Sequence, residues 1–337
     1  MKAYFHPAQD LHIPKTFFSR GKMRQPQEIP DRTGKMLEGL KAMDVPVLQP
    51  TDHGAGPISR VHDLGYLRFL ESAHRRWMEL DDWGDEVMSN IYVRSPNHMH
   101  GILAEAGRYM ADGSSPIGAN TWRAAYWSAQ TALSAADAVI DGERTAYAVC
   151  RPPGHHARRD AAGGFCYLNN AAVATQYMTA RYPRIAILDT DMHHGQGIQD
   201  IFYRRSDVLY ISIHGDTTNF YPGVTGFEDE KGEGEGYGYN INLPMPHGSS
   251  EDYFFGKLEE AMAAIGLFQP DALVLPLGFD IYQNDIQHKV SVTTEGFQRL
   301  GKRISRAGVP MLVVQEGGYD LDALPMNVQQ FFTGLNA

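Results

Sequence analysis

The chain has 337 residues, of which 43% are hydrophobic and 21% are charged, as is typical of a globular protein. Its formal net charge is −10 and it has no basic tract, which argues against nucleic-acid binding and is compatible with a cationic substrate. No run approaches the ~20 apolar residues of a membrane span, and the first residues lack an apolar signal region. The two cysteines, Cys150 and Cys166, form neither a disulfide framework nor a zinc motif. We therefore expect a cytoplasmic protein with no nucleic-acid partner and no membrane contact.

Short aliphatic runs and helical periodicities alternate along the whole chain. The aliphatic runs predict strands at 2–5, 145–150, 185–188, 208–213, 239–243, 272–277 and 309–315. The periodicities predict helices at 31–43, from 61 onward, at 122–140, after 170, at 249–267 with Ser249 as cap, and at 293–307. The alternation predicts an α/β fold with a mainly parallel sheet flanked by helices, and the family resemblance described below implies about eight strands in that sheet. Because no linker or repeat divides the chain, we expect a single domain over residues 1–337.

Residues 80–120 interrupt this alternation with acidic residues, histidines, glycines and prolines. We interpret them as an inserted loop region, and loops of this length in a compact domain are often functional. Two readings stay open: the insertion is functional, or it is a surface excursion that only packs or makes an oligomer contact. Residues 6–30 have no clear period either and predict a long loop.

The most informative stretch is 184–197, where a buried strand is predicted to end in two carboxylates and two imidazoles. Side chains two residues apart in an extended segment point to the same side, so Asp189, Asp191 and His193 share one face. In open α/β sheets, ligands bind at the carboxyl ends of the strands. Two carboxylates and an imidazole this close together are best accommodated by a divalent metal ion between them.

Three other predicted strands also end in reactive residues. His155 and His156 follow a rigid turn of two prolines and a glycine, Asp280 follows the strand at 272–277, and Tyr319 follows the last strand. If the sheet is parallel, all these ends lie at one edge and share one cleft. A metal with three protein ligands and an open position is the catalytic zinc pattern, and Asp191, His193 and Asp280 would supply the three ligands.

Together these motifs resemble the histone deacetylase superfamily, and within it the acetylpolyamine amidohydrolases. The resemblance covers nearly the whole chain, and its carriers are RPPGHH at 151–156, GGFCYLN at 163–169, LDTDMHHG at 188–195, LGFD at 277–280 and GGY at 317–319. It implies a single arginase-like domain around a parallel sheet. It also implies a zinc-dependent amidohydrolase that removes acetyl groups from acetylated polyamines or diamines by means of a metal-activated water.

The resemblance implies a role for each residue of the site. Asp191, His193 and Asp280 would hold one catalytic zinc ion. His156 would be the general base that activates water and then the acid that protonates the leaving amine. His155 would be its electrostatic partner, hydrogen-bonded to Asp189.

The channel and the oxyanion position are implied in the same way. The Tyr319 hydroxyl would polarise the acyl oxygen, and such a donor is worth about 3–4 kcal/mol. Phe165 and Tyr221 would form the channel walls, and the Gly164 carbonyl would accept the substrate amide hydrogen. The family also binds structural potassium. The matching positions are Asp189, Asp191, His193, Ser212 and Ile213 for one ion, and Phe202, Arg205, Val208 and Tyr239 for a second.

Two positions depart from the family pattern. Gln196 stands where many relatives have Asp or Asn, and this side chain would be the hydrogen-bond partner behind His156. A neutral amide would hold the ring without adding a charge, but glutamine is longer than asparagine by one methylene, so the contact itself stays open. Tyr221 stands where Phe is common and adds a hydroxyl to the channel wall.

The sequence leaves three alternatives to polyamine deacetylation open. An arginase or agmatinase-type ureohydrolase shares the fold but resembles a binuclear manganese site, and the stretch Asp280-Ile281-Tyr282 lacks its second carboxylate. A protein or peptide acetyl-lysine deacetylase is a second alternative. The third is an inactive scaffold, against which the intact histidine pair and tyrosine argue.

The net charge and the insertion favour a small cationic acetylated amine as substrate. Glu105 and Asp112, near the end of the insertion, are two carboxylates that could face an incoming ammonium group. The insertion could also pack against a second subunit, and we expect a homodimer.

Overall fold

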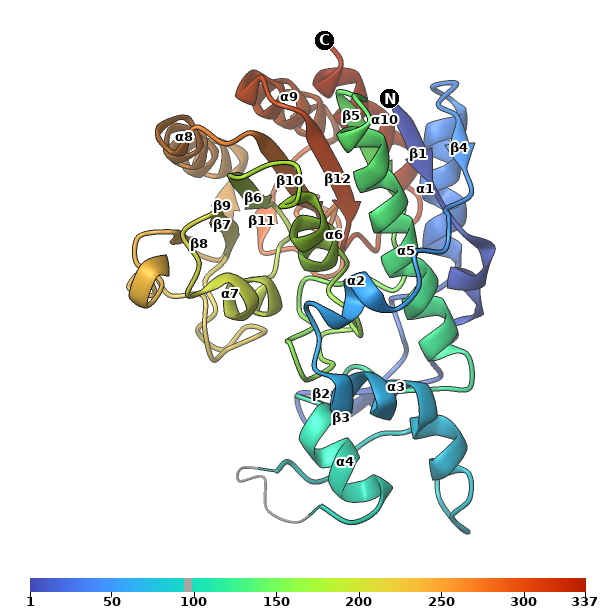
Figure 1. Cartoon of the computed structure of the whole chain (residues 1–337). Coiled ribbons are helices and arrows are strands. Elements are labelled where there is room, and N and C mark those ends of the chain that lie inside the picture. The colour runs from blue at the N-terminus through green and yellow to red at the C-terminus, as the bar shows by residue number, and fades with distance from the viewer. Residues whose placement is uncertain (94–98) are drawn as a thin grey trace.

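In the computed structural model, which describes residues 1–93 and 99–337, eight strands form one sheet in which every neighbouring pair runs parallel (Figure 1). The strand order is β4-β1-β5-β12-β10-β6-β7-β8. The strands are β1 Lys2–Tyr4, β4 Val47–Leu48, β5 Thr145–Ala148, β6 Ile185–Asp189, β7 Val208–Gly215, β8 Asn240–Met245, β10 Ala272–Leu277 and β12 Met311–Gln315. The predicted parallel sheet of about eight strands is therefore confirmed.

Helices cover both faces of the sheet because its strands are apolar on both sides. In β6, Ile185 and Ile187 pack into one core and Ala186 and Leu188 into the other, as the two-residue period of a strand requires. The first core is closed by α5 Thr121–Ile140, α6 Asn170–Met178 and α7 Gln196–Phe202. The second is closed by α1 Asp31–Lys41, α8 Glu251–Phe268, α9 Thr294–Ile304 and α10 Leu324–Leu335.

The end of the molecule remote from the two termini is built by short elements (Figure 1). Here α3 Leu64–Trp77 and α4 Ile102–Tyr109 lie near a hairpin of β2 Phe17–Ser19 and β3 Lys22–Arg24. The remaining elements are α2 Gly56–Ser59, the paired strands β9 Ser249–Ser250 and β11 Val290–Ser291, and three short 3-10 helices at Pro7–Leu11, Gly234–Gly236 and Ser305–Ala307. Among the helices of the described ranges, none combines the length and apolar character of a membrane span.

Several local predictions need correction. Ser250, not Ser249, caps α8, because its side chain accepts from the Tyr253 amide while Ser249 pairs in β9. The loop predicted at 6–30 contains a 3-10 helix and the β2–β3 hairpin. The insertion at 80–120 is partly regular, since it contains α4 and an antiparallel bridge between Val87 and Ile117. Residues 94–98 of the insertion lie outside the described residues.

Candidate metal centre and active site

The strand order explains how residues far apart in the sequence meet at one edge. β5, β12, β10 and β6 are consecutive neighbours in the sheet, and each is followed at its carboxyl end by candidate site residues. His155 and His156 follow β5, Tyr319 follows β12, Asp280 follows β10, and Asp191 and His193 follow β6. The structure thus brings together the four strand ends that the sequence singles out.

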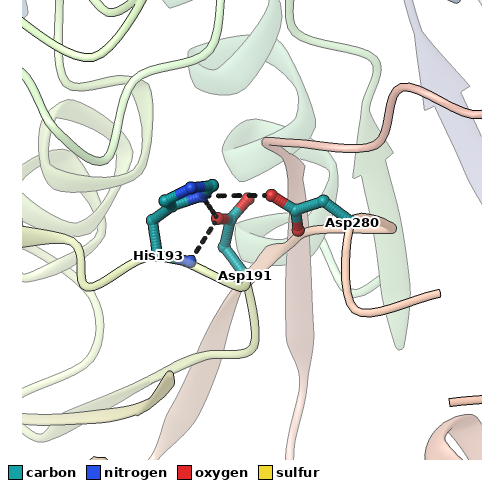
Figure 2. Close-up of side chains that lie close together, drawn as sticks. All are labelled: Asp191, His193 and Asp280. Carbon is teal, nitrogen blue, oxygen red and sulfur yellow. Dashed lines mark hydrogen bonds and ion pairs between the residues drawn. The ribbon is translucent and has the colours of Figure 1, made fainter. Parts of the chain in front are cut away.

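Asp191, His193 and Asp280 form a buried cluster whose potential ligand atoms all lie within 4.8 Å of one another (Figure 2). Nδ1 of His193 lies 3.3 Å from Oδ1 of Asp191 and 3.3 Å from Oδ2 of Asp280. Backbone amides fix both oxygens of Asp191 and one oxygen of Asp280: Gly317 N donates to Asp191 Oδ2 at 2.7 Å, His193 N donates to Asp191 Oδ1 at 2.9 Å, and Met192 N donates to Asp280 Oδ1 at 3.0 Å. The buried Oδ2 of Asp280 has no hydrogen-bond partner.

Electrostatics favour a cation at this cluster. Burial and the neighbouring charge of Asp191 raise the pKa of Asp280, whereas the imidazolium forms of His155 and His193 outweigh burial and lower the pKa of Asp191. Burial disfavours a charged His193, but the neighbouring carboxylates of Asp191 and Asp280 raise its pKa to about 9. A divalent cation neutralises the same two carboxylates and leaves the imidazole neutral and able to ligate. The orphaned oxygen and the two-carboxylate, one-imidazole donor set therefore fit zinc.

The adjacent histidines have opposite electrostatic surroundings. Nδ1 of His155 lies 3.0 Å from Oδ2 of Asp189. Although burial opposes it, the carboxylates of Asp191 and Asp189 raise the pKa of His155 to about 10. Burial, followed by the charges of His155 and His193, lowers the pKa of His156 well below its usual value. The surroundings of the pair therefore raise one pKa and lower the other, which is how an acid and a base are kept apart in one site.

Gln196 makes the predicted contact with His156, although glutamine is longer than asparagine by one methylene. Its Oε1 lies 2.6 Å from Nδ1 of His156, and its Nε2 donates to the Tyr221 hydroxyl at 3.1 Å. The extra methylene is accommodated because Gln196 is the first residue of α7, directly after the turn that follows β6. Gln196 and Tyr221, the two residues that depart from the family pattern, are therefore hydrogen-bonded to each other.

Tyr319 is held by residues that the sequence analysis missed. Its backbone N–H donates to Oδ2 of Asp285 at 2.6 Å. The buried Arg32 guanidinium lies 4.8 Å from the centre of its ring and donates to the carbonyls of Gly318 and Glu316, both at 2.6 Å. The spacing of Asp285, five residues after Asp280, carries no signal, and Arg32 reads as an ordinary residue of the predicted helix at 31–43.

These residues lie around a cavity of about 600 Å³. All the predicted channel residues line it, namely Gly164, Phe165, Tyr221 and Tyr319, as do both histidines of the pair. Glycine is required at position 164, because its φ is +55° and a Cβ there would lie 2.3 Å from Cδ2 of His156. The β2–β3 hairpin also contributes to the lining, which the sequence did not indicate.

The structure separates the two candidate carboxylates of the insertion. Asp112 lines the cavity and accepts from the Tyr221 hydroxyl at 2.7 Å. Glu105 forms a two-pronged ion pair with Arg76 at 2.6 and 2.7 Å and lines a separate hollow instead. The expectation that either of the two could face an incoming ammonium group therefore narrows to Asp112.

The residues matched to potassium sites group at the two ends of β7. At the carboxyl end, Ser212 and Ile213 belong to β7, and Ser212 is the register partner of Asp189 in β6. At the amino end, Val208 begins β7, and the other three members of the second set lie near it in the chain or across the sheet: Phe202, Arg205 and Tyr239. The structure therefore brings each set together without assigning an ion to either.

Comparisons with known proteins agree with this architecture. The family model for the histone deacetylase domain matches residues 26–335. The chain is 61% identical to the acetylpolyamine amidohydrolase of Burkholderia pseudomallei (strain 1710b), across 100% of this chain and 99% of that protein. It is 37% identical to the acetylpolyamine amidohydrolase of Mycoplana ramosa, across 99% of both.

Solved structures give the same result. The crystal structure of the acetylpolyamine aminohydrolase from Burkholderia pseudomallei, from an iodide soak, superposes with a TM-score of 0.99 at 61% identity, covering 100% of this chain and 99% of that one. The HD domain of HDA15 superposes with a TM-score of 0.82 at 27% identity, covering 100% and 91%. The model match, the full-length relatives and the shared fold lead to one conclusion: this chain belongs to the histone deacetylase family of amide hydrolases.

Proposed function

We propose that this enzyme uses one zinc ion to remove acetyl groups from acetylated polyamines or diamines. The observation that carries the proposal is the buried cluster of Asp191, His193 and Asp280 beside a cavity that also holds His156 and Tyr319. The names of the full-length relatives support the substrate class.

Asp191, His193 and Asp280 would hold the metal, and zinc in such a site supplies a Lewis acid that activates water and polarises an acyl oxygen. His156 acts through Nε2, because its Nδ1 is engaged by Gln196. Nε2 takes a proton from the attacking water and delivers it to the leaving amine.

The surrounding side chains orient the substrate and stabilise charge. The Tyr319 hydroxyl donates to the acyl oxygen as negative charge develops there. The charged His155 ring, 3.9 Å from the ring of His156 between centres, adds positive potential nearby. The Gly164 carbonyl, which accepts from the Cys166 thiol at 3.4 Å, has a second lone pair that can accept the substrate amide hydrogen. Phe165 and Tyr221 line the cavity and would confine the alkyl chain of the acetylated amine.

Asp112 is the residue we propose for recognition of a distal ammonium group. It is half-buried and bonded to the Tyr221 hydroxyl, close to the reacting centre. Arg20 and Arg24 also line the cavity, but both are exposed, so solvent screens their repulsion of a cation more strongly. A charge-assisted contact to Asp112 is worth about 1.5–3 kcal/mol, or ten- to a hundredfold in selectivity.

The test compares kcat/KM of the zinc-loaded enzyme for acetylputrescine, acetylcadaverine, an acetyl-lysine peptide and a neutral N-alkylacetamide. We expect the diamines to be the best substrates. Asp112→Asn should reduce their kcat/KM by ten- to a hundredfold more than that of the neutral amide. Glu105→Gln is the matched control, since that carboxylate pairs with Arg76 outside the cavity. If the peptide is the best substrate of the parent enzyme, the protein-deacetylase alternative replaces the polyamine proposal.

We further propose a homodimer of single-domain chains, residues 1–337, in the cytoplasm and without a nucleic-acid partner. The insertion carries large apolar side chains that are 39–49% exposed, namely Leu80, Trp83, Ile91 and Tyr92, and Tyr92 also lines the cavity. The net charge of −10 supports the absence of nucleic-acid binding. We also propose that structural potassium ions bind at the two residue sets around β7.

A further inference from the structure

A line of hydrogen bonds runs from the catalytic histidine to the insertion. Nδ1 of His156 lies 2.6 Å from Oε1 of Gln196, Nε2 of Gln196 lies 3.1 Å from the Tyr221 hydroxyl, and that hydroxyl lies 2.7 Å from Oδ2 of Asp112. The three links join residues that are 40, 25 and 109 positions apart in the sequence. Two of the four members are the positions at which this chain departs from the family pattern.

The carboxylate at the end of the line sets the direction of every bond in it. An ionised carboxylate only accepts hydrogen bonds, so the Tyr221 hydroxyl uses its single proton to donate to Asp112. The phenol oxygen can then only accept, and it accepts from the amide nitrogen of Gln196. The amide oxygen is left facing His156, so Nδ1 of His156 is the donor in that bond and Nε2 carries the free lone pair.

Asp112 is itself fixed in place. Its Oδ1 accepts from the backbone N–H and hydroxyl of Ser114, and its Oδ2 also accepts from the Gly164 amide at 3.2 Å. All its protein neighbours in these bonds are donors, so both of its oxygens serve as acceptors. The far end of the line is therefore a rigid acceptor and not a freely rotating surface carboxylate.

We propose that Tyr221 and Asp112 are positioning residues that act through Gln196 to hold His156 in the tautomer whose Nε2 faces the cavity unprotonated. This inference rests on the proposed role of His156 as general base. It explains why a glutamine functions here: a carboxylate accepts through either oxygen, whereas an amide has a donor end and an acceptor end and must be prevented from flipping.

The line also makes the two departures interdependent. Gln196 is only 2% exposed, so its amide nitrogen has little access to water if the Tyr221 hydroxyl is removed. A flipped amide would present N–H to Nδ1 of His156 and favour the tautomer protonated at Nε2, which cannot accept a proton from water. With a carboxylate at position 196, a phenol hydroxyl is not needed to choose an orientation.

A double-mutant cycle tests this dependence. In the parent enzyme, Tyr221→Phe should lower kcat about tenfold, a fraction of the full contribution of a general base, with KM for a neutral N-alkylacetamide changed less than twofold. In a Gln196→Glu background, adding Tyr221→Phe should change kcat less than twofold. An equal loss in both backgrounds would mean that the hydroxyl acts as channel wall, which overturns the proposal.

A spectroscopic readout is independent of turnover. In the zinc-loaded enzyme with 15N-labelled histidine, the His156 signals are assigned by their loss in His156→Ala. We expect the proton on Nδ1 in the parent and a shift of population toward Nε2 in Tyr221→Phe, with Nδ1 again protonated when Gln196→Glu is added. An unchanged tautomer in Tyr221→Phe would overturn the inference. Because the measurement needs no substrate, it decides even if the proposed deacetylation fails.

Discussion

Tyr319 is held in position by Arg32 and Asp285, which lie far from each other in the sequence. If its hydroxyl stabilises the developing oxyanion, Tyr319→Phe should lower kcat at least ~10²-fold, the usual effect of removing one such donor. Substrate binding should largely survive, because the ring remains. Steady-state kinetics with acetylputrescine measure both effects, and near-normal turnover would remove Tyr319 from the mechanism.

Replacing Asp280 by asparagine tests the metal site more specifically than truncating the side chain. Its Oδ1 accepts from the Met192 amide, and an asparagine keeps that acceptor while replacing the orphaned Oδ2 by a donor. We expect about one zinc per parent chain and less than about a tenth of that in Asp280→Asn, with an unchanged far-ultraviolet circular dichroism spectrum. Two essential metal ions per parent chain would instead favour the ureohydrolase alternative.

Residue types and spacing were enough to predict which side chains cluster, but not how they are supported. Asp191, His193 and Asp280 could be predicted as one cluster because each follows a parallel strand and such strand ends share an edge. The support of Tyr319 by Arg32 and the link from Tyr221 to Asp112 span 109 positions or more. Contacts between segments at that separation follow from packing that no local pattern encodes.

At the scale of single elements, His62 connects the start of α3 to the start of α6. Its Nε2 accepts from the Asn169 amide at 2.9 Å, and Asn169 caps α6. Burial lowers the pKa of His62 to about 4. The folded state therefore disfavours the protonated ring, so the contribution to stability is full above pH ~6.5 and is lost as the pH falls from 6.5 toward 4.

This gives a pH dependence that one substitution should reduce. Between pH 6.5 and 5, His62 should remove about 2 kcal/mol from the free energy of unfolding, at ~1.36 kcal/mol per pH unit. In His62→Gln, a neutral acceptor replaces the ring and this part of the loss should disappear. Urea denaturation of both proteins at the two pH values measures the difference. Buried His12 and His214 shift in the same direction but are common to both proteins, and equal losses in the two proteins would contradict the assignment.

Element type was predicted best where burial alone determines the structure. The strand at 272–277 was placed within the bounds of β10, because both faces of that strand are buried. α10 was not predicted, although Leu324, Val328, Phe331 and Leu335 supply an apolar face at helical spacing. The β2–β3 hairpin could not have been predicted from the sequence, because each strand has only three residues and all three residues of β3 are exposed.

At the scale of the whole molecule, the exposed apolar side chains of the insertion suggest where a second copy binds. We expect sedimentation velocity to give twice the mass of one chain, and Tyr92→Glu to shift the population toward monomer by placing a charge in the contact. Leu267→Glu is the matched control, because Leu267 is 86% exposed on α8, outside the insertion. A parent protein that sediments as a monomer, or a dimer equally sensitive to both changes, would reject the insertion as the interface.

The proposed metal ligands follow two neighbouring strands that are distant in the sequence: Asp191 and His193 follow β6, and Asp280 follows β10, 87 positions after His193. Closing so long a loop costs conformational entropy before Asp280 can join Asp191 and His193, so a complete zinc site does not form in the early steps of folding. We expect the refolding rate to be nearly independent of zinc, while zinc slows unfolding because it binds only once β6 and β10 have paired. Stopped-flow refolding and unfolding in guanidinium, with zinc or with a chelator, measure the two rates; faster refolding with zinc would mean that the site assembles before the sheet. On this view the metal lengthens the lifetime of the finished molecule and does not speed its formation.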